Sequence, residues 1–121
     1  METSSQVVVV GRLGAQVRTK ELPSGDVVTS FTVIVDRPVR ERTKSQKAAT
    51  VDAISCITMR ARTRTMLERM EPGTLVSVDG TLRRRFWRAG PGGSTGGSTG
   101  GATGGAMGSA MEVVARSIQK V

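Results

Sequence analysis

The residues best suited to chemistry lie in one run, Thr81 to Arg88, which reads T-L-R-R-R-F-W-R. Successive side chains of a β-strand point to opposite sides of the sheet, so an extended run would place Arg83, Arg85 and Trp87 side by side on one face. Guanidiniums neutralise phosphates or lie flat on a base, and an indole offers an unpaired base a stacking surface worth about 1 to 3 kcal/mol. The run therefore indicates a site for single-stranded nucleic acid. A charged edge strand with a half-buried Trp87 is the alternative interpretation.

The overall charge also indicates an anionic partner. The chain has 121 residues, with 18 Lys and Arg against 10 Asp and Glu, which gives a formal charge of +8. A membrane partner would require an amphipathic helix or a long apolar run, and the longest apolar run, Val7 to Val10, is far shorter than the roughly 20 residues of a bilayer span. The polar start of the chain, Met1 to Gln6, is not the pattern expected of a signal sequence. We therefore expect a cytoplasmic, nucleoid-associated protein with no membrane partner.

The composition argues against an enzyme and against a metal site. The chain has no histidine and one cysteine, Cys56, so the usual zinc ligand sets and an intrachain disulfide are both excluded. The carboxylates show no recognisable catalytic spacing, and Cys56 has no imidazole to activate it. In its apolar context, I-S-C-I, Cys56 is expected to be a small core residue. The sequence therefore predicts a binding protein without a cofactor.

The elements that must position the arginine-rich run are short strands. Hydrophobic alternation and turn residues predict a hairpin turn at 22–26, a helix at 60–70 that Pro72 and Gly73 end, and strands at 6–13, 27–35, 52–59, 74–80 and 111–118. Gly80 permits a turn or bend from the fourth of these strands into the arginine-rich run. Residues 89–110 repeat G-G-S-T and are predicted to form a flexible loop inside a single domain that covers residues 1–121.

A second basic segment follows the strand at 27–35. It begins at Arg37 and reads R-P-V-R-E-R-T-K-S-Q-K, with five basic residues and one acidic residue. The absence of periodicity predicts a mobile basic loop that gathers phosphates. A solvated surface loop without a partner is the alternative, and it describes most charge runs.

Five strands, a helix between the third and fourth, and a long glycine-rich loop before the last match an all-β, five-stranded Greek-key barrel, the OB-fold. Nearly all of the chain outside that loop resembles the bacterial single-stranded-DNA-binding protein family, in the order and spacing of V-V-V-V-G-R-L-G, L-P-S-G-D-V-V-T-S-F-T-V, E-P-G-T-L-V-S-V-D-G-T-L-R-R-R-F-W and M-E-V-V-A. The resemblance implies sequence-tolerant binding of single-stranded DNA in replication, recombination or repair. It also implies a homotetramer or a dimer. The apolar residues Val7 to Val10 could supply the interface between subunits, or they could simply fill the barrel.

The same resemblance implies a set of contact residues. Three fall on the family's basic and aromatic DNA-contacting strand, one ends the first strand, three lie in the basic loop, and two lie where the third strand ends. In chain order, the expected nucleic-acid-binding residues are Arg12, Arg37, Arg40, Arg42, Met59, Arg60, Arg83, Arg85 and Trp87.

Two departures from the family pattern modify this expectation. Positions that usually carry an aromatic ring in the family hold Val39 or Arg40, Ala53 and Met59. With fewer stacking partners, electrostatic contacts are expected to supply a larger share of the binding energy, so that affinity falls more steeply as salt rises. The chain ends in S-I-Q-K-V, without the acidic tip through which family members recruit replication proteins. We therefore expect an auxiliary paralogue that does not recruit partners by that route.

Two other functions fit the same residues. The scarcity of aromatic side chains would suit an OB-fold protein-interaction subunit with weak or no nucleic-acid binding. Single-stranded RNA is the second alternative, because phosphate and stacking contacts distinguish the two sugars poorly unless a donor reads the 2′-hydroxyl.

Overall fold

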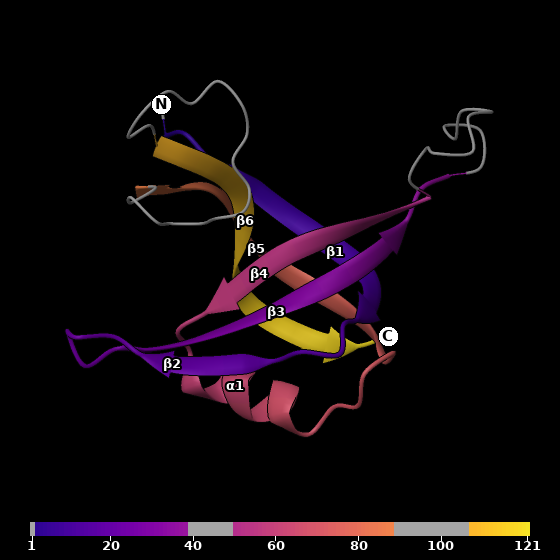
Figure 1. The fold of residues 1–121 in the computed structure, drawn as a ribbon. Coiled ribbons are helices and arrows are strands. Elements are labelled where there is room, and N and C mark those ends of the chain that lie inside the picture. Colours follow the sequence, from indigo (N-terminus) through magenta and orange to yellow (C-terminus); the bar gives the residue numbers. More distant parts are fainter. Residues whose placement is uncertain (1, 39–49, 89–106) are drawn as a thin grey trace.

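The computed structural model describes residues 2–38, 50–88 and 107–121, and these form a twisted sheet that closes into a barrel (Figure 1). Its neighbouring strands follow the order β1-β5-β6-β4-β3-β2, and a further pairing between β1 and β3 closes the sheet on itself. The bounds of the elements are β1 (Gln6–Leu13), β2 (Arg18–Glu21), β3 (Val27–Asp36), β4 (Val51–Thr58), α1 (Ala61–Glu68), β5 (Leu75–Arg88) and β6 (Met107–Lys120). All pairings are antiparallel except that of β4 with β6. The predicted OB-fold, with its helix between the third and fourth long strands, is confirmed.

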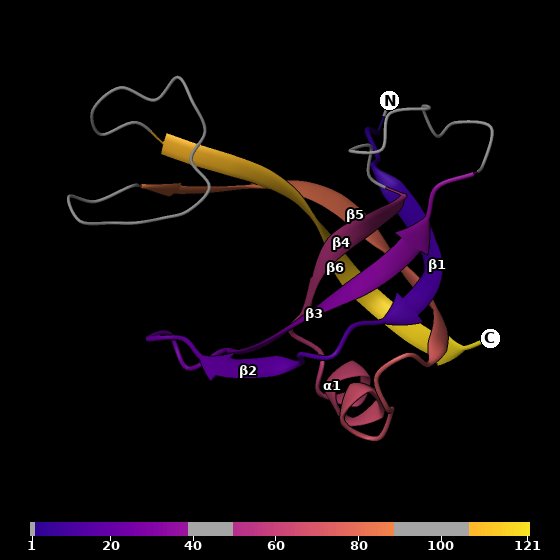
Figure 2. The same cartoon turned by 45° about the vertical axis from the view of Figure 1, so that its right-hand side comes forward.

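Alternating apolar side chains of the long strands fill the barrel. Val33, Val76 and Val78 are completely buried, and Phe31 lies with them in the core. Burial of apolar surface is the main driving force of folding, at about 25 cal/mol per Å² removed from water. The α1 helix covers one end of the barrel and contributes Leu67 to the same core (Figure 2). Among the described residues, no helix has the length and apolar composition needed to cross a bilayer.

The alternation within β1 divides its valines between two environments. Val9 belongs to the core, whereas Val8 and Val10 are exposed on the outside of the barrel. The strand therefore fills the barrel with one face and leaves the other uncovered. Assembly into a dimer or tetramer stays a prediction.

The sequence did not predict β2. Its four residues, R-T-K-E, are all exposed and show no apolar alternation. The strand forms because Arg18–Glu21 pairs with the start of β3 across the predicted turn at 22–26. Gly25 lies in that turn with φ 95°, a conformation that residues with a Cβ rarely adopt. Backbone pairing, rather than side-chain burial, therefore determines this strand.

Two boundaries near the arginine-rich run differ from the prediction. Residues 75–80 of the predicted strand at 74–80 and the arginine-rich run at 81–88 belong to one continuous strand, β5, whose register with β6 shifts between Asp79 and Gly80. A Cβ on Gly80 would meet the Val114 carbonyl oxygen at 2.2 Å, so glycine permits this close approach. The last strand begins at Met107, not 111, because residues 107–110 pair with the end of β5. The predicted loop at 89–110 is therefore wrong over 107–110, and its remainder lies outside the described residues.

Cys56 is a core residue, as predicted, with 1% of its surface exposed. Burial, followed by the charge of Glu112, raises the pKa of its thiol from 9.0 to about 12. Folding therefore favours the protonated thiol. This contribution to stability is fully present below pH 9 and is lost as the pH rises towards about 12.

We predict that Cys56 in the native protein resists alkylation by iodoacetamide at mildly alkaline pH, because the thiolate is the reactive form. The same thiol should react promptly in urea, where it is hydrated. Mass spectrometry of the labelled protein measures both rates. Equal labelling rates in buffer and in urea would contradict the burial of this residue.

Candidate nucleic-acid interface

The end of β5 and the start of β6 form a two-stranded ribbon that leaves the barrel (Figure 2). β5 pairs with β1 only as far as Thr81, and the pairing of β6 with β4 is confined to Val113 and Val114. Beyond Leu82 the two strands pair only with each other, from Arg83 opposite Glu112 to Arg88 opposite Met107. Among the described residues, no other strand therefore covers either edge of this ribbon beyond Leu82.

One face of the ribbon carries two arginines around a buried carboxylate. A guanidinium nitrogen of Arg83 lies 2.7 Å from Glu112 Oε2, and Arg85 Nε lies 3.8 Å from Glu112 Oε1. The Glu112 side chain is 5% exposed, whereas those of Arg83 and Arg85 are 49% and 60% exposed. The Glu112 carboxylate therefore forms an ion pair with each guanidinium on its buried side, and the outer surfaces of both guanidiniums face solvent. Sequence reasoning missed this role of Glu112, because it depends on the register between β5 and β6.

The indole of Trp87 completes this face. The guanidinium carbon of Arg85 lies 5.0 Å from the centroid of the Trp87 ring, within the range of a cation–π contact. Trp87 is half-buried and lies across Gly108, its partner on β6; a Cβ at Gly108 would come within 2.5 Å of the ring. The glycine therefore provides the room in which the ring lies against the neighbouring strand. We call Arg83, Arg85 and Trp87, with Glu112 beneath them, the shelf.

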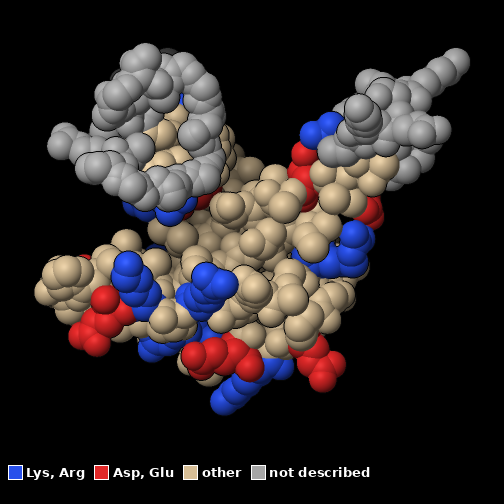
Figure 3. Space-filling view, in the orientation of Figure 1, with Lys and Arg blue, Asp and Glu red and all other residues tan. Residues whose placement is uncertain are grey.

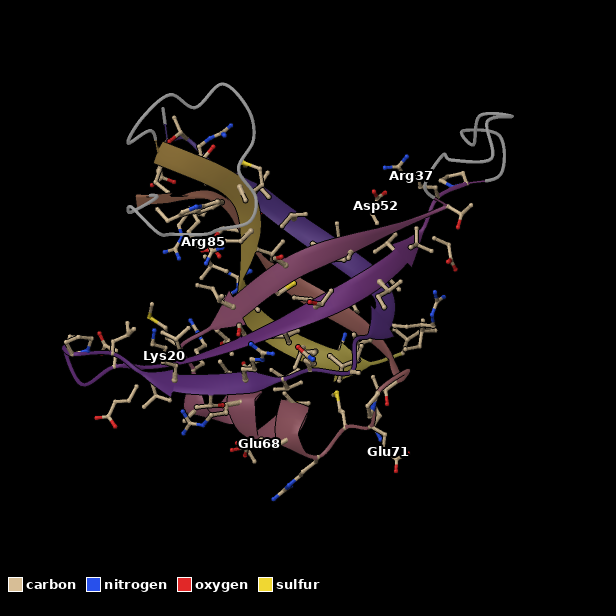
Figure 4. The ribbon with its side chains drawn as sticks, in the orientation of Figure 1. Lys20, Arg37, Asp52, Glu68, Glu71 and Arg85 are labelled. Carbon is tan, nitrogen blue, oxygen red and sulfur yellow. The ribbon has the colours of Figure 1, made fainter. Side chains whose placement is uncertain are left out.

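A groove of about 300 Å³ extends from the shelf to the barrel. Arg85, Ala110, Met111 and Glu112 line it on the ribbon side, and residues of β2, β3 and β4 line it on the barrel side. The barrel-side residues include Arg18, which sequence reasoning missed because β2 shows no apolar pattern. Figure 4 shows Arg85 on the ribbon and Lys20 on β2, on either side of β4. The groove thus has cationic side chains at both margins.

The outer face of β3 and β4, beside the groove, carries small side chains together with the half-buried Ile34 and Ile57 and has no aromatic ring among its described residues. Ser30, Ser55 and Ala53 are exposed there. Figure 3 shows this face as largely neutral, with blue Lys and Arg groups at its margins. The other described aromatic residue of the barrel, Phe31, is buried in the core. Phe31 borders the groove but exposes only 3% of its surface, whereas Trp87 lies beside Arg85, which lines the groove. Among the described residues, Trp87 is therefore the aromatic ring near the groove that a base can reach.

Two of the predicted contact residues form ion pairs at the opposite end of the sheet. Arg12 donates two hydrogen bonds to Asp36, at 2.9 and 3.2 Å. Arg37 lies 2.7 Å from Asp52, and its hydrogen bond lowers the pKa of that carboxyl. Figure 4 shows Arg37 and Asp52 together, far along the sheet from Arg85. These partners offset part of the charge that the sequence assigned to the interface.

The other predicted residues lie apart from the shelf. Met59 and Arg60 are exposed where β4 ends and α1 begins, and neither is among the residues that line the groove. The backbone N–H of Arg60 donates to the hydroxyl of Thr58. Arg40 and Arg42 lie outside the described residues. Within the described part of the chain, no cluster of three or more Cys, Asp or Glu residues could hold a metal ion.

Residues 4–100 match the model of the single-strand binding protein family. Two similar proteins are single-stranded DNA-binding protein A of Bacillus subtilis (strain 168), with 32% identity over 81 residues, and single-stranded DNA-binding protein 3 of Listeria innocua, with 31% identity over 88 residues. These alignments cover 67% and 73% of this chain but 45% and 53% of the relatives. The chain thus spans about half the length of the curated relatives it matches.

Two solved structures share the fold. One is the Plasmodium falciparum SSB complex with ssDNA, with a TM-score of 0.69 and 18% identity over 100% of this chain and 96% of that one. The other is the mitochondrial single-stranded DNA-binding protein Rim1 of S. cerevisiae, with a TM-score of 0.66 and 13% identity over 99% and 96% of the two chains. At these identities the likeness concerns the fold.

Proposed function

This chain belongs to the single-strand binding protein family, and from that premise we propose that it binds single-stranded DNA along the shelf and the adjoining groove. The observation that supports this most strongly is the contact of Trp87 with the exposed guanidinium of Arg85, which lies 3.8 Å from the buried Glu112. An unpaired base stacks on the indole, and the phosphates on either side of it approach the guanidiniums. Every base has a flat face, so such binding tolerates any sequence.

The charges of the shelf determine how much of the binding energy is electrostatic. Arg83 and Arg85 together carry two positive charges, and Glu112 offsets one of them. Arg18, across the groove, donates a hydrogen bond to the neutral Gln16 at 3.0 Å, and no described carboxylate forms an ion pair with it. Phosphate contacts by these groups release counterions, at a slope of about −0.7 per contact on a single strand. With one aromatic platform beside the groove, we expect affinity to fall steeply with salt.

We further propose a role without catalysis, in which the protein covers exposed strands during replication, recombination or repair. Such a role requires a preference for single strands over duplex. Stacking on Trp87 provides that preference, because the bases of a duplex are already stacked on one another and cannot lie against the indole. Phosphate contacts alone would not distinguish the two forms.

The test compares labelled oligo-dT with a duplex of the same length, by fluorescence anisotropy at several salt concentrations. We predict tighter binding of the single strand at every salt concentration, with affinity that declines as salt rises. Equal affinity for the two forms would contradict the proposal. Unlabelled oligo-rU serves as competitor; displacement more efficient than that by oligo-dT would identify RNA as the ligand.

A further inference from the structure

The face of the ribbon opposite the shelf carries a second group of exposed apolar side chains. β5 presents Leu82, Arg84 and Phe86 on this side, and Met111 lies opposite Arg84 on β6. The exposed fractions are 59% for Phe86, 44% for Met111 and 41% for Leu82. Phe86 is thus the most exposed aromatic residue of the described chain, and the shelf does not use it.

The charge of this far face favours an anionic ligand. Among the side chains that the structure describes on this face, the charged one is Arg84, which donates a hydrogen bond to the Ser109 hydroxyl at 3.2 Å. No described carboxylate pairs with Arg84, because the carboxylate of this ribbon, Glu112, lies beneath the shelf on the other side. A second copy of the chain docked here would bring like charges together. A phosphate backbone complements the charge, and a base complements the exposed ring.

The shape of the ribbon allows one ligand to reach both faces. Neighbouring strands lie about 4.8 Å apart, so a two-stranded ribbon is narrow. Beyond Leu82, no described strand of the barrel pairs with either of its edges. Phe86 and Trp87 are consecutive residues that point to opposite sides. A nucleic-acid strand that leaves the shelf can therefore cross the edge and continue along the far face.

We propose that Phe86 and Arg84 form a second stacking site, at which a single-stranded DNA already bound at the shelf places a further base after crossing the edge of the ribbon. This inference rests on the proposed function. The ring of Phe86 stacks on the base, and the guanidinium of Arg84 approaches the adjoining phosphate. The site therefore extends the length of DNA that one subunit binds.

The test varies the length of the DNA, since OB-folds bind about 4 to 16 nucleotides. An oligo-dT of about 6 nucleotides would occupy the shelf alone, whereas one of about 16 would span both faces. We predict that Phe86→Ala binds the short oligomer like the wild type and the long one about 5-fold or more weakly. Met66→Ala, which removes an exposed apolar side chain of α1, serves as the matched control and should bind both normally.

A relocated tryptophan provides a second measurement. In the double variant Phe86→Trp, Trp87→Phe, the emission from position 86 should respond to the long oligomer and not to the short one. The second site would be overturned if Phe86→Ala bound the long oligomer normally. It would also be overturned if sedimentation showed a changed oligomeric state of the Phe86→Ala variant without a loss of affinity for DNA. In either case the wild type would still bind single strands, whereas failure of the wild type to bind them would overturn the proposed function itself.

Discussion

Replacement of Trp87 by alanine is expected to weaken the binding of oligo-dT by roughly 5- to 150-fold, which corresponds to the loss of about 1 to 3 kcal/mol of stacking. The loss should be large because the barrel face beside the groove carries small side chains and Phe31 is buried. Within the described residues, no other ring next to the groove can take over the stacked base. Arg85 loses its aromatic neighbour at the same time.

A labelled oligonucleotide and anisotropy measure this change, since the variant has no tryptophan emission. Trp87→Phe is the matched control, because it keeps a flat ring at the same position and should retain most of the affinity. Thermal unfolding monitored by circular dichroism establishes that both variants remain folded. Wild-type affinity in a folded Trp87→Ala variant would exclude base stacking at the shelf.

The second large effect is a difference between the two arginines of the shelf. Arg83 lies 2.7 Å from the buried Glu112, whereas Arg85 lies 3.8 Å from it and is the more exposed of the two. Arg83→Ala should therefore lower the free energy of unfolding by about 1 to 3 kcal/mol, because a buried carboxylate loses its close partner. Arg85→Ala should cost less than about 1 kcal/mol, as expected for an exposed pair.

We expect the reverse order in DNA binding. The guanidinium of Arg85 lines the groove and is freer to meet a phosphate, so Arg85→Ala should weaken binding more than Arg83→Ala. Arg85→Ala should also reduce the slope of log K against log salt concentration by about 0.7, the value of one phosphate contact on a single strand. Urea unfolding and salt-resolved anisotropy of the two variants provide the comparison. Equal losses of stability would contradict the anchoring role of Glu112.

The sequence was sufficient for the barrel and for the grouping of the shelf residues, because both follow from strand alternation. Val76 and Val78 of β5 alternate with Ser77 and Asp79, and the same period places Arg83, Arg85 and Trp87 on one side of that strand. Gly80 does not end a strand as predicted, but it lies where the register of β5 against β6 shifts and where a Cβ would meet the Val114 carbonyl. Patterns of this kind can be recognised from the sequence of a single strand, because they depend only on which face of that strand is buried.

Features that depend on pairing between distant segments could not be predicted. Glu112 became the anchor of the shelf, and Gly108 the support of the indole, only through the register of β6 against β5. The ion pair of Arg37 with Asp52 likewise joins the residue after β3 to a residue of β4, far along the sequence. In each case a residue with an ordinary sequence context acquires its role from a neighbour that the local pattern does not identify.

The most direct measurement uses the emission of Trp87, the only tryptophan of the chain, during titration with oligo-dT at increasing salt. We predict a saturable change of emission, with a midpoint that moves to higher oligonucleotide concentration as salt rises. An emission spectrum that stays constant while a labelled oligonucleotide binds would show that the strand lies elsewhere on the protein.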